Sequence, residues 1–421
     1  MKKYCEYKNS CISWIGEIPG HWELKRNKSF MSMTGYKAGE NADLYTLLSL
    51  TINGVIARDI ESGKGKFPKD FDDYQVVKKD ELIFCLFDID ETPRTVGLVN
   101  TEGMITGAYT ALKVNKEYAL PKYIYYYYLC VDNIKALRPY YSGLRKTIRS
   151  DKFLQLYIPL PPIKEQLVIV SYIDEKTAKI DEYIDKKNKE IEALKEWKKA
   201  LIAHVVTKGL NTNAKMKDSG VSWIGDIPEH WDIRKMKYTF TERSEKNHPD
   251  EQILCATQNQ GVIPQTMYSN RVVVVNKGFE NLKFVKKGDF VISLRSFQGG
   301  IEYAYYQGII SAAYTILYPN KIIDSEYAKH LLKSHQFIEL LKTCVTGIRE
   351  GQNINYDLLR KKYLPIPPIE EQQEIVEYID AATTKADKMI VELTNHVESM
   401  KEYKQRLIAD VVTGKINVQP E

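Results

Sequence analysis

The chain repeats itself, and this duplication constrains its fold more than any other feature of the sequence. The segment SWIGEIPGHW at Ser13–Trp22 returns as SWIGDIPEHW at Ser222–Trp231. YIPLPPIKEQ at Tyr157–Gln166 returns as YLPIPPIEEQ at Tyr363–Gln372, 206 residues later. A third motif, KEWKKALIAHVVTKGLN, returns as KEYKQRLIADVVTGKIN with the same offset. The 421-residue chain is therefore a tandem duplication of one unit, and each motif has to be interpreted twice.

Between these anchors the two copies match faintly but in the same order. KKDELIFCL at Lys78–Leu86 faces KKGDFVISL at Lys286–Leu294, and SGLR ending at Arg145 faces TGIR ending at Arg349. Short β-rich runs are separated by Gly, Asn and Asp turns, and helical stretches precede SGLR and TGIR. The pattern predicts two mixed α/β (α+β) domains, over residues 1–157 and 210–363.

Composition changes abruptly after each Pro-rich motif. From Ile163 to Thr207 there is neither Pro nor Gly, which predicts one helix of about 45 residues, roughly 67 Å long. Apolar residues form a heptad seam in this stretch, and the second copy keeps the register. We expect helical regions 158–209 and 364–421 to pair as an antiparallel coiled coil. The alternative is that each helix packs on its own globular domain.

Charge locates the surface that could bind a polyanion. The net charge of +5 is too small to prove a nucleic-acid partner. The globular halves carry +4 and +5, whereas residues 158–209 carry +1 and residues 364–417 carry −4. Polyanion binding would therefore belong to the globular halves, and the helices are suited to spacing and protein docking.

Several classes of protein are disfavoured by what the sequence lacks. No apolar window of about 18 residues and no secretory signal are present. Six scattered cysteines without a C-x-x-C pair favour a reducing, cytoplasmic location, and no spacing typical of metal ligands occurs.

Taken together, the repeated motifs W-I-G-x-I-P-x-H-W, P-x-P-P-I-x-E-Q and L-I-A-x-V-V-T resemble those of the specificity subunit of type I restriction–modification enzymes. The resemblance covers essentially the whole chain and includes its duplication. It implies two target-recognition domains that each read one half of a split, asymmetric double-stranded DNA sequence, separated by an antiparallel helix pair.

The resemblance also implies partners and cofactors. Two copies of a modification subunit would bind S-adenosylmethionine and methylate adenine. A restriction and translocation subunit, using ATP and Mg²⁺, can join. No cofactor is expected in this chain itself.

The residues themselves carry no catalytic motif. The Pro-Pro pairs lack the Asp or Asn before and the aromatic after that a [DNS]-P-P-[YF] methyltransferase loop needs. The only G-x-G, Gly63-Lys64-Gly65, lies in a polar turn, and no G-x-x-x-x-G-K-[ST] loop occurs. We therefore expect a binding subunit rather than an enzyme. The alternative function is a coiled-coil scaffold with two protein-binding heads.

The first candidate DNA-reading site is a polar segment before a glycine. Thr51 and Asn53 precede Gly54 in one copy, and Gln258-Asn259-Gln260 precede Gly261 in the other. Amide side chains at loop tips suit adenine, and they differ between copies, as two half-sites would require. A plain hairpin turn is the alternative.

The second candidate site comes after the apolar strand of each copy. It offers Asp88, Asp90 and Arg94 in the first copy, and it offers Arg295, Ser296 and Gln298 in the second. Arginine is the usual reader of guanine, so Arg295 beside two glycines is the strongest single candidate. A surface salt bridge is the alternative.

The third candidate site keeps a G-x-R pattern in both copies. Arg145, Lys146 and Arg149 belong to the first copy and Arg349 to the second. A feature shared by both halves suits a shared ligand feature, and phosphate is common to every DNA sequence. Helix-end cations on backbone carbonyls are the alternative. The tyrosine run Tyr125–Tyr128 is more simply explained by core and interface packing. The motif tryptophans are expected to be packing anchors between each globular domain and a helix end; they are Trp14, Trp22, Trp223 and Trp231. The DNA sequence recognised stays open.

Overall fold

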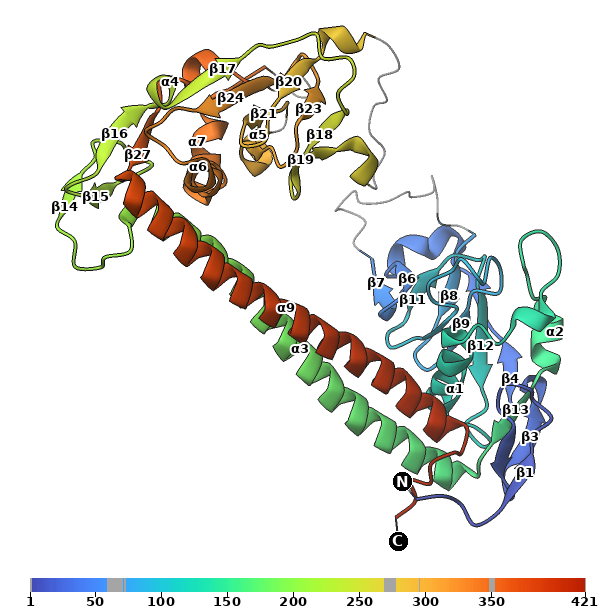
Figure 1. The fold of residues 1–421 in the computed structure, drawn as a ribbon. Helices are drawn as coiled ribbons and strands as arrows, with labels where there is room; N and C mark the ends of the chain where they lie inside the picture. Colours follow the sequence, from blue (N-terminus) through green and yellow to red (C-terminus); the bar gives the residue numbers. More distant parts are fainter. Residues whose placement is uncertain are drawn as a thin grey trace. The chain divides into compact units, whose positions relative to one another are not determined.

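The computed structural model describes residues 2–58, 71, 73–268, 278–294, 296–347 and 353–420. The chain divides into two compact units. Unit 1 comprises residues 1–187 and 395–421, and unit 2 comprises residues 188–394. Each unit therefore combines one β-rich domain with segments of both long helices (Figure 1).

The β-rich domain of unit 1 is built on an antiparallel sheet in the order β10-β9-β12-β4. Its strands are β4 (Met31–Met33), β9 (Leu82–Phe84), β10 (Val96–Leu98) and β12 (Thr110–Val114). Side chains alternate across a strand. Leu82 and Phe84 accordingly join the core that contains helix α1 (Pro121–Asn133), whereas Ile83 joins a second core with Val55 and Val77.

Smaller elements surround this sheet. β11-β8-β5 form a three-stranded sheet, and β1–β2, β3–β13 and β6–β7 form pairs. Their bounds are β1 (Tyr7–Asn9), β2 (Glu17–Pro19), β3 (Glu23–Arg26), β5 (Tyr36–Lys37), β6 (Leu48–Thr51), β7 (Gly54–Ala57), β8 (Gln75–Val77), β11 (Gly103–Ile105), α2 (Ser150–Gln155) and β13 (Tyr157–Leu160).

Unit 2 repeats the arrangement with the sheet order β22-β21-β24-β17. Phe290 and Ile292 face the core that contains α6, and Val291 faces a second core. The sheet consists of β17 (Phe240–Arg243), β21 (Phe290–Ile292), β22 (Glu302–Tyr303) and β24 (Thr315–Pro319). The other elements are β14 (Met216–Asp218), β15 (Asp226–Pro228), β16 (Asp232–Lys235), α4 (Met236–Thr239), β18 (Leu254–Thr257), β19 (Gly261–Pro264), β20 (Lys283–Val285), α5 (Ser296–Gly299), β23 (Gly308–Ile310), α6 (Ser325–Leu332), α7 (His335–Lys342), β25 (Val345–Thr346), β26 (Asn353–Ile354), α8 (Tyr356–Leu359) and β27 (Tyr363–Ile366).

The two long helices are α3 (Ile163–Lys208, 46 residues) and α9 (Ile369–Val412, 44 residues). In unit 1 the beginning of α3 shares a core with the end of α9, through Ile173 and Val411 among others. In unit 2 the end of α3 shares a core with the beginning of α9, through Val206 and Ile379. The helices are therefore antiparallel, as predicted.

The long helices also pack on the β-rich domains, which was the alternative expectation. The cores that join the two helices contain residues of the neighbouring β-rich domain as well. Ion pairs span the helix seam in both units, Asp181–Lys404 at 2.6 Å and Lys198–Asp387 at 2.5 Å. No helix in the described residues is long and apolar enough to cross a membrane.

Aromatic residues take the packing roles expected of them. Tyr126, Tyr127 and Tyr128 are buried on α1, and the Tyr128 hydroxyl accepts a hydrogen bond from the Asn27 amide. Trp22 and Trp231 are fully buried, each in the core that receives the end of a long helix.

Candidate nucleic-acid interface

The first candidate site is the turn of a hairpin in each unit. In unit 1, Thr51 pairs with Gly54, which leaves Ile52 and Asn53 exposed at the tip. The Thr51 hydroxyl donates to the Gly54 carbonyl (3.0 Å) and accepts from the Asn53 amide nitrogen (3.1 Å). Gly54 has φ +95°, a conformation that favours glycine. The segment is a hairpin turn, and it presents the Asn53 side chain to solvent.

In the corresponding turn of unit 2, which has a longer loop, a threonine hydroxyl makes the same two kinds of hydrogen bond. The Thr257 hydroxyl donates to the Gly261 carbonyl (2.9 Å) and accepts from the Gln260 amide nitrogen (3.0 Å). Gln258, Asn259 and Gln260 are exposed at the tip. The two copies therefore share a rigid base and differ in the number and identity of the side chains it presents.

Unit 2 brings the first and second candidate sites together. Gln258 Nε2 donates to Gln298 Oε1 (3.3 Å), which joins the β18–β19 turn to α5. Ser296, by contrast, is buried, and its hydroxyl accepts from the Ser293 amide nitrogen (2.8 Å) at the beginning of α5. Arg295 lies outside the described residues, so its assignment stays a prediction.

A cavity of about 540 Å³ lies between these two loops. Amide side chains from both loops line it, together with one buried carboxylate, that of Glu302. The residues around the cavity are Ala256, Thr257, Gln258, Asn259, Gln260, Tyr268, Ser293, Leu294, Gln298, Glu302 and Tyr314.

Sequence reasoning missed the ion pair beneath this cavity. Lys333 Nζ lies 2.6 Å from Glu302 Oε1, and it also donates to the carbonyls of Gln258 (3.1 Å) and Gly299 (2.9 Å). Burial raises the pKa of Glu302 to about 7, against the opposing effect of Lys333. Neither residue belongs to a repeated motif. The only available signal was Glu302 itself, a charge beside an apolar strand.

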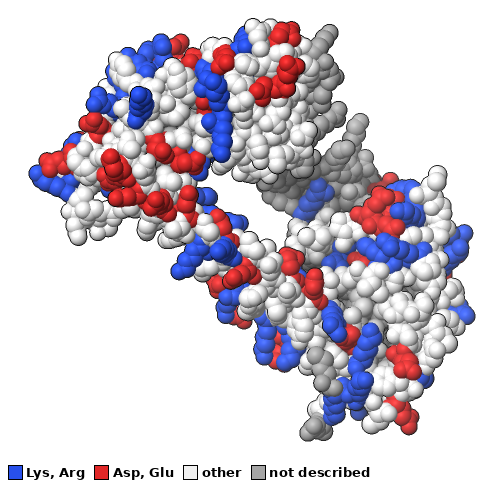
Figure 2. Space-filling model, viewed as in Figure 1, with Lys and Arg blue, Asp and Glu red and all other residues white. Residues whose placement is uncertain are grey.

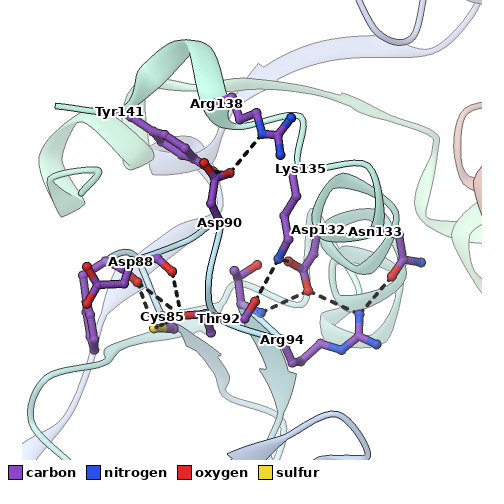
Figure 3. A network of polar contacts seen from close by, with 12 residues as sticks. Cys85, Asp88, Asp90, Thr92, Arg94, Asp132, Asn133, Lys135, Arg138 and Tyr141 are labelled. Atoms are coloured by element: carbon purple, nitrogen blue, oxygen red, sulfur yellow. Dashed lines mark hydrogen bonds and ion pairs between the residues drawn. The ribbon is translucent and has the colours of Figure 1, made fainter. Parts of the chain in front are cut away.

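In unit 1 the second candidate site meets the third. Arg145 Nη2 lies 2.6 Å from Asp88 Oδ2, and Lys146 Nζ lies 3.2 Å from Asp90 Oδ2. Arg138, which sequence reasoning missed, donates from Nε to Asp90 Oδ1 at 2.9 Å (Figure 3). The hydrogen bond from Arg138 lowers the pKa of Asp90. The loop therefore presents paired charges of both signs.

In unit 1 the basic residues of this third site are bound to carboxylates rather than to helix-end carbonyls. Arg149 pairs with Asp151 at 3.1 Å, and the side chains of Arg145 and Arg149 are 71% and 72% exposed. Exposed ion pairs contribute about 0–1 kcal/mol, so these cations can exchange a carboxylate for a phosphate at little cost. Arg349 of the second copy lies outside the described residues and stays a prediction.

Arg94 has a different environment from the other candidates. Its side chain is only 18% exposed, and Nη1 contacts Asp132 Oδ2 (3.2 Å) and Asn133 Oδ1 (3.0 Å) (Figure 3). Lys135 and the Thr95 amide nitrogen also bind the buried Asp132 carboxylate. Because this network ties the beginning of β10 to the end of α1, we assign Arg94 a structural role and remove it from the candidate interface.

Charges of both signs alternate over the surface drawn in Figure 2, in both units and along the helices. On this face, therefore, electrostatic attraction alone does not single out one region. The candidate interface is defined better by the loop tips than by a single basic surface.

The repeated motifs form a joint between each β-rich domain and the beginning of a long helix, where the sequence predicts the tryptophans as packing anchors. Glu165, at the beginning of α3, accepts hydrogen bonds from Tyr4 (2.6 Å), His21 (2.7 Å) and Trp22 (3.1 Å). Glu371, at the beginning of α9, accepts from His230 (2.7 Å) and Trp231 (3.0 Å). The H-W of one motif thus binds the E of the other within the same unit.

The neighbouring glutamines complete the joint. Gln166 accepts from the Leu120 amide nitrogen (2.8 Å) and donates to the carbonyls of Tyr118 and Pro161. Gln372 makes the equivalent bonds, accepting from the Asp324 amide nitrogen (2.7 Å). The motifs therefore fix each long helix to a β-rich domain.

The long helices expose aromatic and apolar side chains at equivalent positions. Tyr183 and Met389 are 38% and 43% exposed, and Trp197 and Tyr403 are each 45% exposed. Within each helix the two positions are 14 residues apart, close to four turns, and so lie on one face. Tyr183 is equivalent to Met389, and Trp197 is equivalent to Tyr403. Unit 1 contains Tyr183 and Tyr403, and unit 2 contains Trp197 and Met389.

Comparison with known proteins supplies the family. A family model described as type I restriction modification DNA specificity domain matches residues 54–193 and 216–399. The chain is 25% identical, over 96% of each chain, to a protein of Methanocaldococcus jannaschii that is provisionally named type I restriction enzyme MjaX specificity subunit. It is 27% identical to the type I restriction enzyme MjaVIII specificity subunit of the same organism, over 63% of this chain and 64% of that one.

Solved structures show the same fold. A chain from a study of complex assembly and conformational transition of the type I R-M system has a TM-score of 0.67, at 15% identity, over 95% of this chain and 99% of that chain. The HsdS subunit from Thermoanaerobacter tengcongensis has a TM-score of 0.52, at 15% identity, over 95% of this chain and 98% of that chain.

Proposed function

This chain belongs to the type I restriction–modification DNA specificity family, and we propose that each of its two units reads one half of a bipartite, asymmetric DNA sequence. The chain is a DNA-recognition subunit rather than an enzyme, and the scaffold alternative is not favoured. The observation that carries the two-half proposal is the hairpin turn. Thr51 and Thr257 lock it identically, whereas the tip residues differ in number and kind.

Direct readout needs polar side chains held on a rigid support, and phosphate contacts need exposed cations. Asn53 in unit 1 and Gln258, Asn259 and Gln260 in unit 2 supply the first. Arg145, Lys146 and Arg149 supply the second in unit 1.

Exchange of one recognition domain tests the proposal. Replacing residues 1–157 with the equivalent region of a relative is expected to change one half of the methylated motif and leave the other half intact. The measurement is genome-wide methylation mapping in cells that express the chimera with its modification partner. A motif that changes in both halves, or in neither, contradicts the division of labour.

We further propose that the long helices set the unread gap and dock two copies of the modification subunit in the cytoplasm. That subunit would supply S-adenosylmethionine-dependent adenine methylation, and a restriction subunit using ATP and Mg²⁺ can join. The exposed pairs Tyr183–Met389 and Trp197–Tyr403 support two equivalent docking faces, because each repeats at a distance of 206 residues. Aromatic residues are enriched at protein interfaces.

Charge substitution on one docking face tests this assignment. Trp197→Glu is expected to weaken binding of one modification subunit, and Trp197→Glu with Tyr403→Glu to weaken both. Asn188→Glu adds the same charge at an exposed position on another side of α3 and is the matched control. Native mass spectrometry of the assembled complex counts the subunits. Full two-copy assembly by the double variant would remove these residues from the docking faces.

A further inference from the structure

The cavity of unit 2 has a chemical character of its own. Gln258 donates from Nε2 to Gln298 Oε1 at 3.3 Å. This bond leaves the Oε1 of Gln258 as an acceptor and the Nε2 of Gln298 as a donor for a ligand. Both residues line the 540 Å³ cavity, one from the β18–β19 turn and one from α5. An acceptor and a donor held side by side suit a flat ligand edge that offers the complementary pair.

The floor of the cavity carries an incompletely satisfied carboxylate. Glu302 is 2% exposed and lines the cavity, with Oε1 bound by Lys333. Its Oε2 is buried and has no hydrogen-bond partner among the described residues. Buried polar groups are nearly always paired, so an unpaired carboxylate oxygen calls for an explanation.

Glu302 is also a difference between the two copies. The pairing of β9 with β10 and of β21 with β22 places Gly97 of unit 1 at the position of Glu302. A Cβ atom at Gly97 would lie 2.5 Å from Val55 Cγ2 and 2.6 Å from Leu50 Cδ1. Apolar side chains therefore fill in unit 1 the space that the carboxylate occupies in unit 2, where Ala256 replaces Leu50.

Lys333 connects the carboxylate to both reading loops. Its ammonium has three donors, and its three contacts are Glu302, the Gln258 carbonyl and the Gly299 carbonyl. The lysine thereby fixes the turn that carries Gln258 to the end of the helix that carries Gln298.

We propose that this cavity is a base-reading site of unit 2, which takes the major-groove edge of an adenine, with Gln258 and Gln298 as readers and Lys333 and Glu302 as positioning residues. The inference rests on the proposed function and deepens it. Adenine offers an N6 amino donor and an N7 acceptor in the major groove, the pair that glutamine amides recognise. Guanine offers two acceptors there, and its O6 would meet the Gln258 oxygen, which is also an acceptor.

The test of the readers uses the full chain assembled with its modification subunit. Gln258→Ala and Gln298→Ala are each expected to reduce discrimination for adenine at one position of one half-site by roughly 5- to 150-fold. The matched control is Gln307→Ala, which removes an exposed glutamine side chain of the same unit bonded to Glu251. Methylation of duplexes randomised at each motif position gives the discrimination ratio at every base.

The positioning pair is tested by substitutions that separate a reading defect from a folding defect. Lys333→Met is expected to lower discrimination at the same position, and Lys333→Arg to retain most of it. Since Lys333→Met leaves a buried carboxylate uncompensated, the double variant Glu302→Gln with Lys333→Met serves as the second probe. It is expected to assemble normally and still to discriminate poorly at that one position.

Two outcomes overturn the inference in different ways. If the glutamine variants keep wild-type discrimination at every position while exchange of residues 1–157 still changes one half of the motif, the proposed function stands and this cavity does not read DNA. If the glutamine variants lose discrimination at a position that requires guanine, thymine or cytosine, the cavity reads a base but not adenine. Failure of the domain exchange itself would contradict the proposed function instead.

Discussion

At the scale of single residues, the candidate interface of unit 1 is held by charges that neutralise one another. Asp90 forms ion pairs with Arg138 and Lys146, and Asp88 forms one with Arg145. The three cations are exposed, so their pairing is weak and can be exchanged for contacts with DNA. Removal of a cation and removal of its carboxylate should therefore affect DNA binding in opposite directions.

Arg145→Ala should weaken binding to all DNA sequences and reduce the salt slope by about 0.9, the value for one lost phosphate contact. Asp90→Asn should strengthen non-specific binding and steepen the slope, because it frees Arg138 and Lys146. Binding of the assembled complex to unrelated duplexes at several salt concentrations measures both. Equal slopes for the two variants and the wild type would place this loop away from the DNA backbone.

Glu302 predicts a pH dependence of stability. Burial raises its pKa from 4.5 to about 7, so the folded chain holds this proton more tightly than the unfolded chain. The stabilisation is present below pH 4.5 and is lost as the pH rises through 7, by about 3 kcal/mol in total. Glu302→Gln should therefore gain stability relative to the wild type between pH 5.5 and 8. Parallel thermal unfolding across that range measures the difference, and a constant difference would show that Glu302 does not titrate there.

The sequence predicts some site residues and not others for identifiable reasons. The turns at Gly54 and Gly261 were predictable because polar residues before a glycine define a local turn. The sequence does not reveal that Arg94 is structural, because its partner Asp132 lies 38 positions away and no local pattern connects the two residues. Lys333 and Glu302 were missed for the same reason, since only the tertiary fold brings a helix end beside a strand.

At the scale of elements, the joint between each recognition domain and a long helix is formed in both units by the repeated motifs. The first long helix was predictable to within one residue, because helix formers without Pro or Gly persist for more than 40 residues. The second was predicted as a helical region over 364–421, within which α9 lies. Most strands have only three or four residues, too few for alternation to define them, so their pairing comes from the tertiary fold. The sequence predicted the tryptophans of the joint as packing anchors at a helix end, but not the glutamates that bind them.

Substitution of the joint glutamates should rank by the hydrogen bonds that each accepts. Glu165→Ala removes three bonds and leaves the buried Trp22 indole nitrogen without its acceptor, whereas Glu371→Ala removes two. An unsatisfied buried donor costs about 1–3 kcal/mol, so both variants should be destabilised, Glu165→Ala more strongly. Glu175→Ala, which breaks an exposed pair with Lys179 on the same helix, is the control and should change little. Denaturant unfolding measures the free energy of unfolding of each variant. A reversed order, or no loss of stability, would show that these glutamates do not stabilise the joint.

At the scale of the whole molecule, duplication explains why each unit takes segments from both helices. The beginning of α3 and the end of α9 complete the core of unit 1, and their counterparts complete the core of unit 2. Neither recognition domain is therefore packed by its own helix alone. The duplication and the antiparallel pairing were predictable from the repeated motifs and the shared heptad register. The base partners of the loops were not, because the copies diverge most where they would contact DNA.

The continuity of α3 from one unit to the other leads to a prediction about the unread gap. Four residues inserted after Thr177 lengthen the helix by about 6 Å and rotate its C-terminal part by about 40°. DNA rises about 3.4 Å per base pair, so a helix pair that sets the gap should lengthen it by one or two base pairs. Assembly should also weaken, because four residues are not a whole heptad and the apolar seam has to re-register. A matching insertion after Thr383 in α9 should restore part of it. Both half-site sequences should stay the same, since no recognition loop is altered. Methylation mapping of the single and double insertions measures gap and half-sites together, and an unchanged gap at full activity would show that the helices do not set the spacing.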